Sequence, residues 1–99
     1  MTIIWTPVAK ESYNEIEAFL TIRWNLEITQ DFISAVSQTM RIVKDNPYCF
    51  QRWEHDHSYL KGFVNSKISF YYKVKSQEIV VYLFWNNVQN PESLEEMLK

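Results

Sequence analysis

Apolar side chains recur along the first half of the chain at the three- and four-residue steps typical of amphipathic helices. A short β-prone segment, residues 2–6, comes first. Thr6-Pro7 then favours a helix start, because Thr caps helix N-termini and Pro fits the first helical position. The first helix is expected to end at Arg23 or Trp24. Its apolar stripe consists of Ala9, Tyr13, Ile16, Leu20 and Trp24.

A second apolar stripe predicts a second helix. Thr29 is the expected N-cap, and Asn46-Pro47 ends the helix because the residue before a proline disfavours helical backbone. The stripe consists of Phe32, Val36, Met40 and Val43. Since the link between the two helices is short, they are expected to pack as an antiparallel hairpin whose shared apolar side needs a partner.

Three strands predicted downstream supply that partner. Residues 59–65 alternate weakly, residues 67–75 alternate cleanly, and residues 78–85 are apolar on both faces, as in a covered central strand. Residues 92–98 form either one or two helical turns that dock Leu94 and Leu98, or a frayed tail. The order β-α-α-β-β-β predicts a single α+β domain, residues 1–99, with the helical hairpin on one face of an antiparallel sheet.

Composition narrows the class of protein. A single Gly among 99 residues excludes Gly-rich phosphate loops, and the apolar run at residues 79–85 is too short to span a membrane. The lone Cys49 cannot form an internal disulfide and is expected to be a buried thiol beside Tyr48 and Phe50. With no signal peptide visible, the expected location is the cytoplasm.

Charge is distributed unevenly along the chain. The net charge of −2 argues against a general nucleic-acid binder. Residues 32–75, however, carry seven basic and three acidic side chains, a balance of +4, between two ends of −3 each. This basic centre is either a binding face or an ordinary solvated surface.

No strong catalytic or cofactor-binding motif is present, and no cofactor is expected. His55 and His57 would point the same way on a strand and are candidate metal ligands, but two ligands do not make a site, so no metal is expected. Lysines around residues 61–75 alternate with aromatic residues. They suit phosphate contact with base stacking, or alternatively protect a sheet edge from aggregation. Trp5, Trp24 and Trp85 are expected in the core.

Several segments together resemble the RelE/ParE superfamily, toxins of bacterial type II toxin–antitoxin systems associated with plasmid stabilisation and growth regulation. They are Ile4-Trp5-Thr6-Pro7, Val43-Lys44-Asp45-Asn46-Pro47, residues 68–74, and the apolar strand 78–85 followed by Asn86-Asn87-Val88-Gln89-Asn90-Pro91 and Leu94. In the family this last strand runs into Asp-x-Arg-Gln-Asn-Pro. The family fold is the β-α-α-β-β-β arrangement deduced above.

The resemblance implies a set of site residues. In ribonuclease members, basic and Tyr side chains on the sheet cleave mRNA on the ribosome. Lys61 matches the family's basic position on the first strand of the meander and, with Arg52, would stabilise phosphate charge. Tyr72 is the third catalytic candidate, although alternation turns it toward the helices. The candidate target contacts are Lys67, Lys73 and Gln89.

Two departures bear on activity. Asn86 and Val88 stand where the family has Asp and Arg, which predicts an incomplete endoribonuclease site. The resemblance also implies a cognate antitoxin as partner, and the ribosome with its mRNA or DNA gyrase as target, without a membrane. The function expected is therefore a toxin that inhibits translation or replication, weakened or inactive. The alternative is a non-enzymatic protein-binding module that retains the toxin fold.

Overall fold

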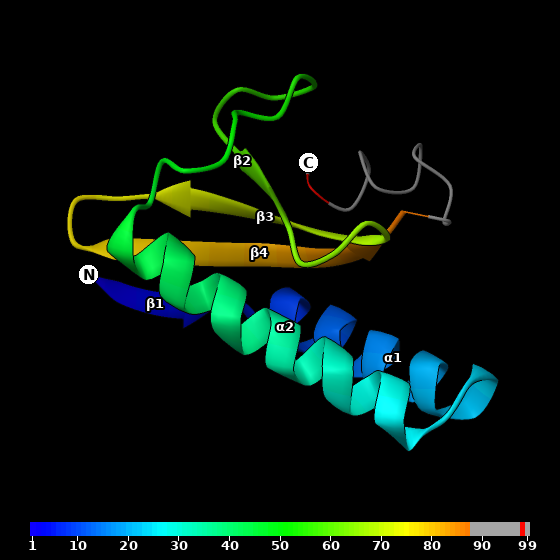
Figure 1. The fold of residues 1–99 in the computed structure, drawn as a ribbon. Helices are drawn as coiled ribbons and strands as arrows, with labels where there is room; N and C mark the ends of the chain where they lie inside the picture. Colours follow the sequence, from blue (N-terminus) through cyan, green and yellow to red (C-terminus); the bar gives the residue numbers. More distant parts are fainter. Residues whose placement is uncertain (88–97, 99) are drawn as a thin grey trace.

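The computed structural model describes residues 1–87 and residue 98. Two helices form one layer and a four-stranded sheet forms the other, so that the helices cover one face of the sheet (Figure 1). In chain order the elements are β1 (Thr2–Trp5), α1 (Pro7–Arg23), α2 (Leu26–Asp45), β2 (Leu60–Phe63), β3 (Ile68–Val74) and β4 (Glu78–Asn86). The predicted α+β class, element order and helical hairpin are confirmed.

The sheet has the strand order β1-β4-β3-β2 and is mixed. β2, β3 and β4 form the predicted antiparallel meander. β1 instead runs parallel to β4, with Thr2 opposite Glu78 and Trp5 opposite Val81, which corrects the expectation of a wholly antiparallel sheet. The direction of this pair is set by the path of the chain through the helical hairpin, and no turn sequence joins the two strands to reveal it.

Capping side chains fix where each helix begins. The Thr6 hydroxyl accepts a hydrogen bond from the Ala9 N–H (3.1 Å) and donates one to the Tyr82 carbonyl (3.2 Å), which ties the start of α1 to β4. The cap of α2 is Asn25, not Thr29, and the helix begins four residues earlier than expected. Thr29 is buried in the first turns, where its hydroxyl donates to the Asn25 carbonyl.

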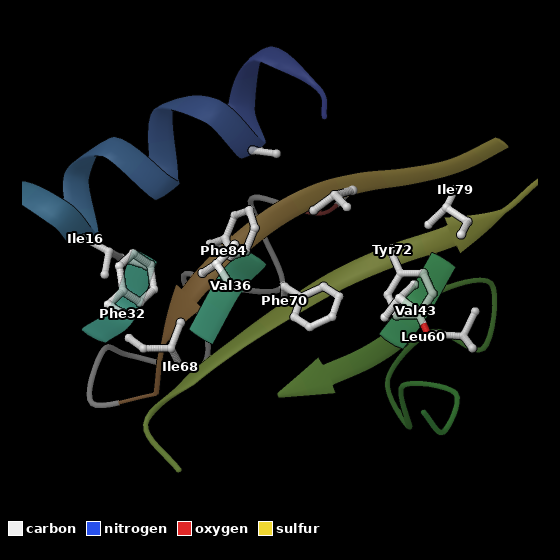
Figure 2. Close-up of a cluster of buried hydrophobic side chains, with 12 residues drawn as sticks. Ile16, Phe32, Val36, Val43, Leu60, Ile68, Phe70, Tyr72, Ile79 and Phe84 are labelled. Atoms are coloured by element: carbon white, nitrogen blue, oxygen red, sulfur yellow. The ribbon is translucent and has the colours of Figure 1, made fainter. Parts of the chain in front are cut away.

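The main core lies between the helices and the sheet (Figure 2). Phe70 and Phe84 project from β3 and β4 toward Phe32 and Val36 of α2. Gly62 on β2 is required by this packing, because a Cβ added there would overlap the ring of Phe70. Because Gly62 has no side chain, the Phe70 ring can lie directly against the backbone of β2.

A buried serine completes the hydrogen bonding of β4. The parallel ladder with β1 ends at Val81, so the N–H of Phe84 lies beyond the reach of β1. The Ser12 hydroxyl on α1 accepts from this N–H (3.0 Å) and donates to the Ala9 carbonyl (3.0 Å). A helix side chain thereby takes the place of a strand partner, as buried backbone groups require.

The opposite face of the sheet carries a second buried cluster, which consists of Trp53, Tyr59, Tyr71, Leu83 and Trp85. This confirms that β4 is covered on both faces. A register shift between Tyr71 and Tyr72 leaves Tyr82 as an extra residue in β4, because Tyr71 lies opposite Leu83 and Tyr72 opposite Val81. Because aromatic rings cover this face, little of the centre of the sheet is exposed to solvent there.

Two expectations about single side chains are wrong. Trp24 is 66 % exposed, because α1 ends at Arg23 and the backbone at Trp24 leaves the helical path that the apolar stripe assumed. Cys49 is exposed, and Phe50 takes the inward position, with its ring centroid 5.8 Å from that of Phe70. Trp85 is buried as expected, although in the cluster on the face away from the helices.

Candidate functional site: a lysine face and a groove beside β1

Two lysines lie on the sheet face that the helices leave open. Alternation along β3 places Tyr71 and Lys73 on this face, and Lys61 joins them because it pairs directly with Tyr71 across β2 and β3. The Lys61 ammonium lies 5.4 Å from the ring centroid of Phe63 and 5.9 Å from that of Tyr71. We call these two lysines and their rings the lysine face; its rings are Tyr59, Phe63, Tyr71 and Tyr82.

Aromatic rings hold the second ammonium as well. The Lys73 nitrogen lies 4.4 Å from the ring centroid of Tyr59 and 5.4 Å from that of Tyr82. Burial raises the pKa of Tyr59, so this ring stays neutral, and its hydroxyl donates to the Leu98 carbonyl (3.1 Å). Cation–π contacts orient an ammonium without neutralising its charge.

The lysine face is suited to bind an anion. Within residues 1–87 and 98 no carboxylate oxygen lies within 4.0 Å of the ammonium of Lys61 or Lys73, so neither lysine has a carboxylate partner there. The exposed Asp56 nearby has a lowered pKa, chiefly from its hydrogen bonds with Ser58 and in smaller part from the charge of Lys73. Two unpaired cations on one surface favour phosphate or carboxylate groups.

The rings of the lysine face are less suited to base stacking. Tyr71 is fully buried and Tyr59 nearly so, which leaves Phe63, 49 % exposed, as the ring of this face most open to solvent. A stacking platform needs an open ring face. Anion contact is therefore the stronger chemical property of this surface.

The other predicted site residues lie elsewhere. Arg52 pairs with Leu60, which faces the helical core, so the register puts Arg52 on the opposite side from Lys61; its guanidinium donates to the His57 carbonyl (2.9 Å). Tyr72 is fully buried toward the helices, as its alternation predicts.

The hydroxyl of Tyr72 donates to the Pro47 carbonyl (2.7 Å), and burial raises its pKa. Lys67 lies in the turn between β2 and β3, where its carbonyl accepts from the Asn87 N–H (2.8 Å). Gln89, Val88 and Leu94 lie outside the described residues. The structure thus brings together Lys61 and Lys73, and separates both from Arg52 and Tyr72.

A groove of about 410 Å³ runs between β1 and α2. We call it the β1 groove. Ile3, Trp5, Ile33 and Met40 are among its apolar lining, and Arg41 and Lys44 are the charged residues that line it. β1 is also an edge strand, paired on one side with β4.

Sequence reasoning missed this groove. Ile33, Ser37 and Lys44 recur at helical spacing beside the main apolar stripe of α2, whose member Met40 also lines the groove. That secondary stripe is the signal that could have indicated the groove. It becomes meaningful only once the position of β1 beside α2 is known.

The histidine hypothesis gains no third ligand from the described residues, among which no group of three or more His, Cys, Asp or Glu side chains gathers. The His55 ring packs edge-on against Trp53, with centroids 5.3 Å apart, and its Nε2 lies 3.5 Å from a carboxylate oxygen of Glu54. Neither helix in the described part of the chain has the length and hydropathy needed to cross a membrane.

Comparison with solved structures decides the fold. The chain matches no protein-family model and no curated protein. A chain of the chromosomal ParDE TA system from P. aeruginosa superposes with a TM-score of 0.75 at 14 % sequence identity, over 87 % of this chain and 95 % of that one. The chain has the RelE/ParE toxin fold.

A second structure supports the same toxin fold. The YoeB/ParE toxin from Agrobacterium tumefaciens superposes with a TM-score of 0.63 at 15 % identity, over 87 % of this chain and 98 % of that one. In both cases nearly the whole length of the other chain is matched. The resemblance that the sequence suggested is therefore confirmed at the level of the fold.

Proposed function

We propose that this protein is the toxin component of a toxin–antitoxin pair. The observation that carries the proposal is the toxin fold itself, matched over 87 % of the chain with a TM-score of 0.75. Two surfaces are available for the two partners that such a toxin needs. The β1 groove is assigned to the antitoxin, and the lysine face to the cellular target.

The β1 groove suits an extended acidic segment of an antitoxin. The free edge of β1 offers unpaired backbone groups to an added strand, and the apolar lining receives alternate side chains of that strand. Arg41 and Lys44 give the groove a single sign of charge, so carboxylates on the partner complement it. Arg41 and Lys44 belong to the basic centre of the chain, residues 32–75, so this assignment interprets part of that centre as a binding face.

On its cellular target the protein is proposed to act by binding and not by catalysis, as an inhibitor of DNA gyrase would. The three residues first considered for catalysis do not share a surface, because Lys61 lies on the open face, Arg52 on the other side and Tyr72 in the core. General acid–base cleavage needs its groups within reach of one reacting bond. An inhibitor that binds needs only the two cations.

Ribosome-dependent mRNA cleavage is the second candidate. The observation in its favour is the pair Lys61 and Lys73, which presents two unpaired cations to a phosphate backbone. A non-enzymatic module that binds a partner and has no effect on growth is the third possibility, and the same experiment separates all three.

Induced expression in a bacterial host tests the proposal. We expect growth arrest by the wild-type chain and relief by the double variant Lys61→Gln with Lys73→Gln, since both anion contacts are lost. Lys75→Gln, at an exposed lysine of the β3–β4 turn, is the matched control and should leave arrest unchanged. If growth arrests, DNA synthesis stops first and mRNA stays intact, the result supports inhibition by binding. If mRNA is cut within codons, the result supports cleavage. If growth is unaffected, the toxin function is refuted.

The antitoxin assignment has its own test. A pull-down with the wild-type chain from the native host should recover a small partner in stoichiometric amount. Arg41→Glu with Lys44→Glu should weaken its affinity, whereas Lys10→Glu, an exposed lysine of α1, should not. The assignment would be contradicted if no such partner were recovered. It would also be contradicted if the Arg41→Glu, Lys44→Glu double variant bound the partner as tightly as the Lys10→Glu control.

A further inference from the structure

One aromatic ring connects the lysine face to the end of the chain. The ring centroid of Tyr59 lies 4.4 Å from the Lys73 ammonium, and the Tyr59 hydroxyl donates to the Leu98 carbonyl at 3.1 Å. Leu98 comes 39 positions later in the sequence, and Figure 1 shows the end of the chain on the side of the sheet opposite the helices. The same side chain therefore contacts both a cation of the lysine face and the chain end.

The backbone places this ring by closing a short loop. The Trp53 N–H donates to the Tyr59 carbonyl (2.9 Å), and the Tyr59 N–H donates to the Asp56 carbonyl (3.1 Å). Residues 54–58 are exposed, whereas Trp53 and Tyr59 at the two ends of the loop are buried. The loop is thus held at its base, where its last residue adds its ring to the buried cluster of the sheet.

Neighbouring groups fix the orientation of the Tyr59 ring. Tyr82 packs edge-on against it with the centroids 5.3 Å apart, and Trp53 does so at 6.2 Å. Leu98 packs against the same cluster and accepts the hydrogen bond from the hydroxyl. The ring that lies nearest to the Lys73 ammonium is therefore itself held by rings and by a backbone acceptor.

A well-held ring orders the lysine above it. Lysine is a flexible side chain, and ordering it on a bound anion costs conformational entropy. The Lys73 ammonium already lies over Tyr59 and within 5.4 Å of the Tyr82 centroid, whereas the Lys61 ammonium lies 5.4 Å from its nearer ring. Order present before binding raises affinity without any new contact to the ligand.

The acidic group nearby is occupied by another partner. One carboxylate oxygen of Asp56 accepts from the N–H of Ser58 (2.9 Å) and from its hydroxyl (2.7 Å). These bonds are the chief cause of the lowered pKa of Asp56, and the charge of Lys73 is a smaller one. Lys73 is thus ordered by its rings while its charge remains available to an anion from outside.

We propose that Tyr59 is a positioning residue for Lys73 and that Leu98 anchors Tyr59, so that anion binding on the lysine face depends on the end of the chain. The inference rests on the proposed function in one respect, the assignment of the lysine face to the cellular target. The physical claim concerns phosphate alone and can be measured without that target.

Titration of the purified full-length chain with inorganic phosphate, followed by NMR of the Lys73 ε-methylene group, tests the positioning role. In the wild type the ring current of Tyr59 should shift these protons upfield. Tyr59→Leu should reduce this upfield shift and raise the dissociation constant roughly two- to fivefold, the effect of losing one cation–π contact. Tyr59→Phe keeps the ring without the hydrogen bond and should lie between the two. Tyr48→Phe, at an exposed tyrosine of the loop after α2, is the matched control and should change neither quantity.

The anchoring by the chain end has a separate test. Leu98→Gln replaces the apolar side chain that packs on the cluster and leaves both Tyr59 and the net charge unaltered. We expect it to reproduce the result of Tyr59→Phe, because the ring loses its anchor in both variants. Leu26→Gln, at an exposed leucine at the start of α2, is the matched control. Circular dichroism shows that each variant is folded, and if Tyr59→Leu is not, Tyr59→Phe and Leu98→Gln decide.

Three outcomes would overturn the inference. Unchanged or tighter phosphate binding in Tyr59→Leu would refute the positioning role, because the ring would then be neutral toward the anion or compete with it. Equal behaviour of Leu98→Gln and Leu26→Gln would refute the anchoring. Wild-type binding by the double variant Lys61→Gln with Lys73→Gln would place the phosphate elsewhere. Growth arrest alongside any of these leaves the toxin function intact, whereas the expected phosphate results without arrest refute only the toxin function.

Discussion

Replacement of Ser12 by alanine tests the link between α1 and β4. The side chain is 6 % exposed, and its hydroxyl bridges the Ala9 carbonyl and the Phe84 N–H at 3.0 Å each. Alanine removes the hydroxyl while retaining the Cβ, so the helix remains intact. The Phe84 N–H is then buried without a partner, beyond the end of β1.

The expected cost follows from two opposing effects. An unsatisfied buried N–H costs about 1–3 kcal/mol. Alanine favours the helix over serine by roughly 0.5 kcal/mol. We therefore expect Ser12→Ala to lower the free energy of unfolding by about 1–2 kcal/mol, a large share of the total for so small a domain.

Urea unfolding followed by circular dichroism provides the measurement. The midpoint should fall with an unchanged denaturant slope, since the same surface is exposed on unfolding. Ser34→Ala, an exposed serine of α2, is the control and should be neutral or slightly stabilising. Equal behaviour of Ser12→Ala and Ser34→Ala would refute the argument that the serine substitutes for a strand partner.

Three further outcomes are expected from the core and the caps. Gly62→Ala should destabilise by about 1–3 kcal/mol because its Cβ displaces the Phe70 ring, visible as a lower thermal midpoint. Thr6→Ala should cost about 1 kcal/mol in urea unfolding through the lost cap, and Thr6→Ser should retain most of it. Burial raises the pKa of Tyr72 above 10.0, so the folded state favours the neutral phenol. The stability that this preference contributes to the fold is present below about pH 10 and is lost as pH rises through the folded pKa. Tyr72→Phe should make the thermal midpoint fall less steeply above pH 10, and an equal fall would contradict this origin.

Patterns that are local in sequence predicted most of the fold. The helical stripe through Phe32, Val36 and Val43 and the alternation of residues 67–75 each follow from burial on one side of one element. The parallel pairing of β1 could not be predicted this way, because Thr2 and Glu78 are brought together only by the path of the whole chain. The end of the first helix was predicted within one residue, but the burial of Trp24 was not, because the stripe assumes helical backbone at Trp24 and this residue is instead the C-cap.

The site was predictable in part. Alternation along residues 67–75 suffices to place Tyr71 and Lys73 on one face, whereas the position of Lys61 beside Tyr71 depends on the register between β2 and β3. The position of Arg52 depends on its bridge to Leu60 within an irregular loop, and nothing in the local pattern fixes that register. Grooves lie between elements that are distant in sequence, so their lining becomes apparent only in three dimensions.

The parallel pairing of β1 with β4 has a consequence for the order of events during synthesis. The first strand to be made pairs with the last, so β1 and the apolar side of α1 have no sheet to join until β4 exists. Contacts of such long sequence separation form late in folding. A polypeptide interrupted before β4 lacks the strand that holds β1 and supplies Tyr82, so a prematurely ended product cannot form either the β1 groove or the lysine face.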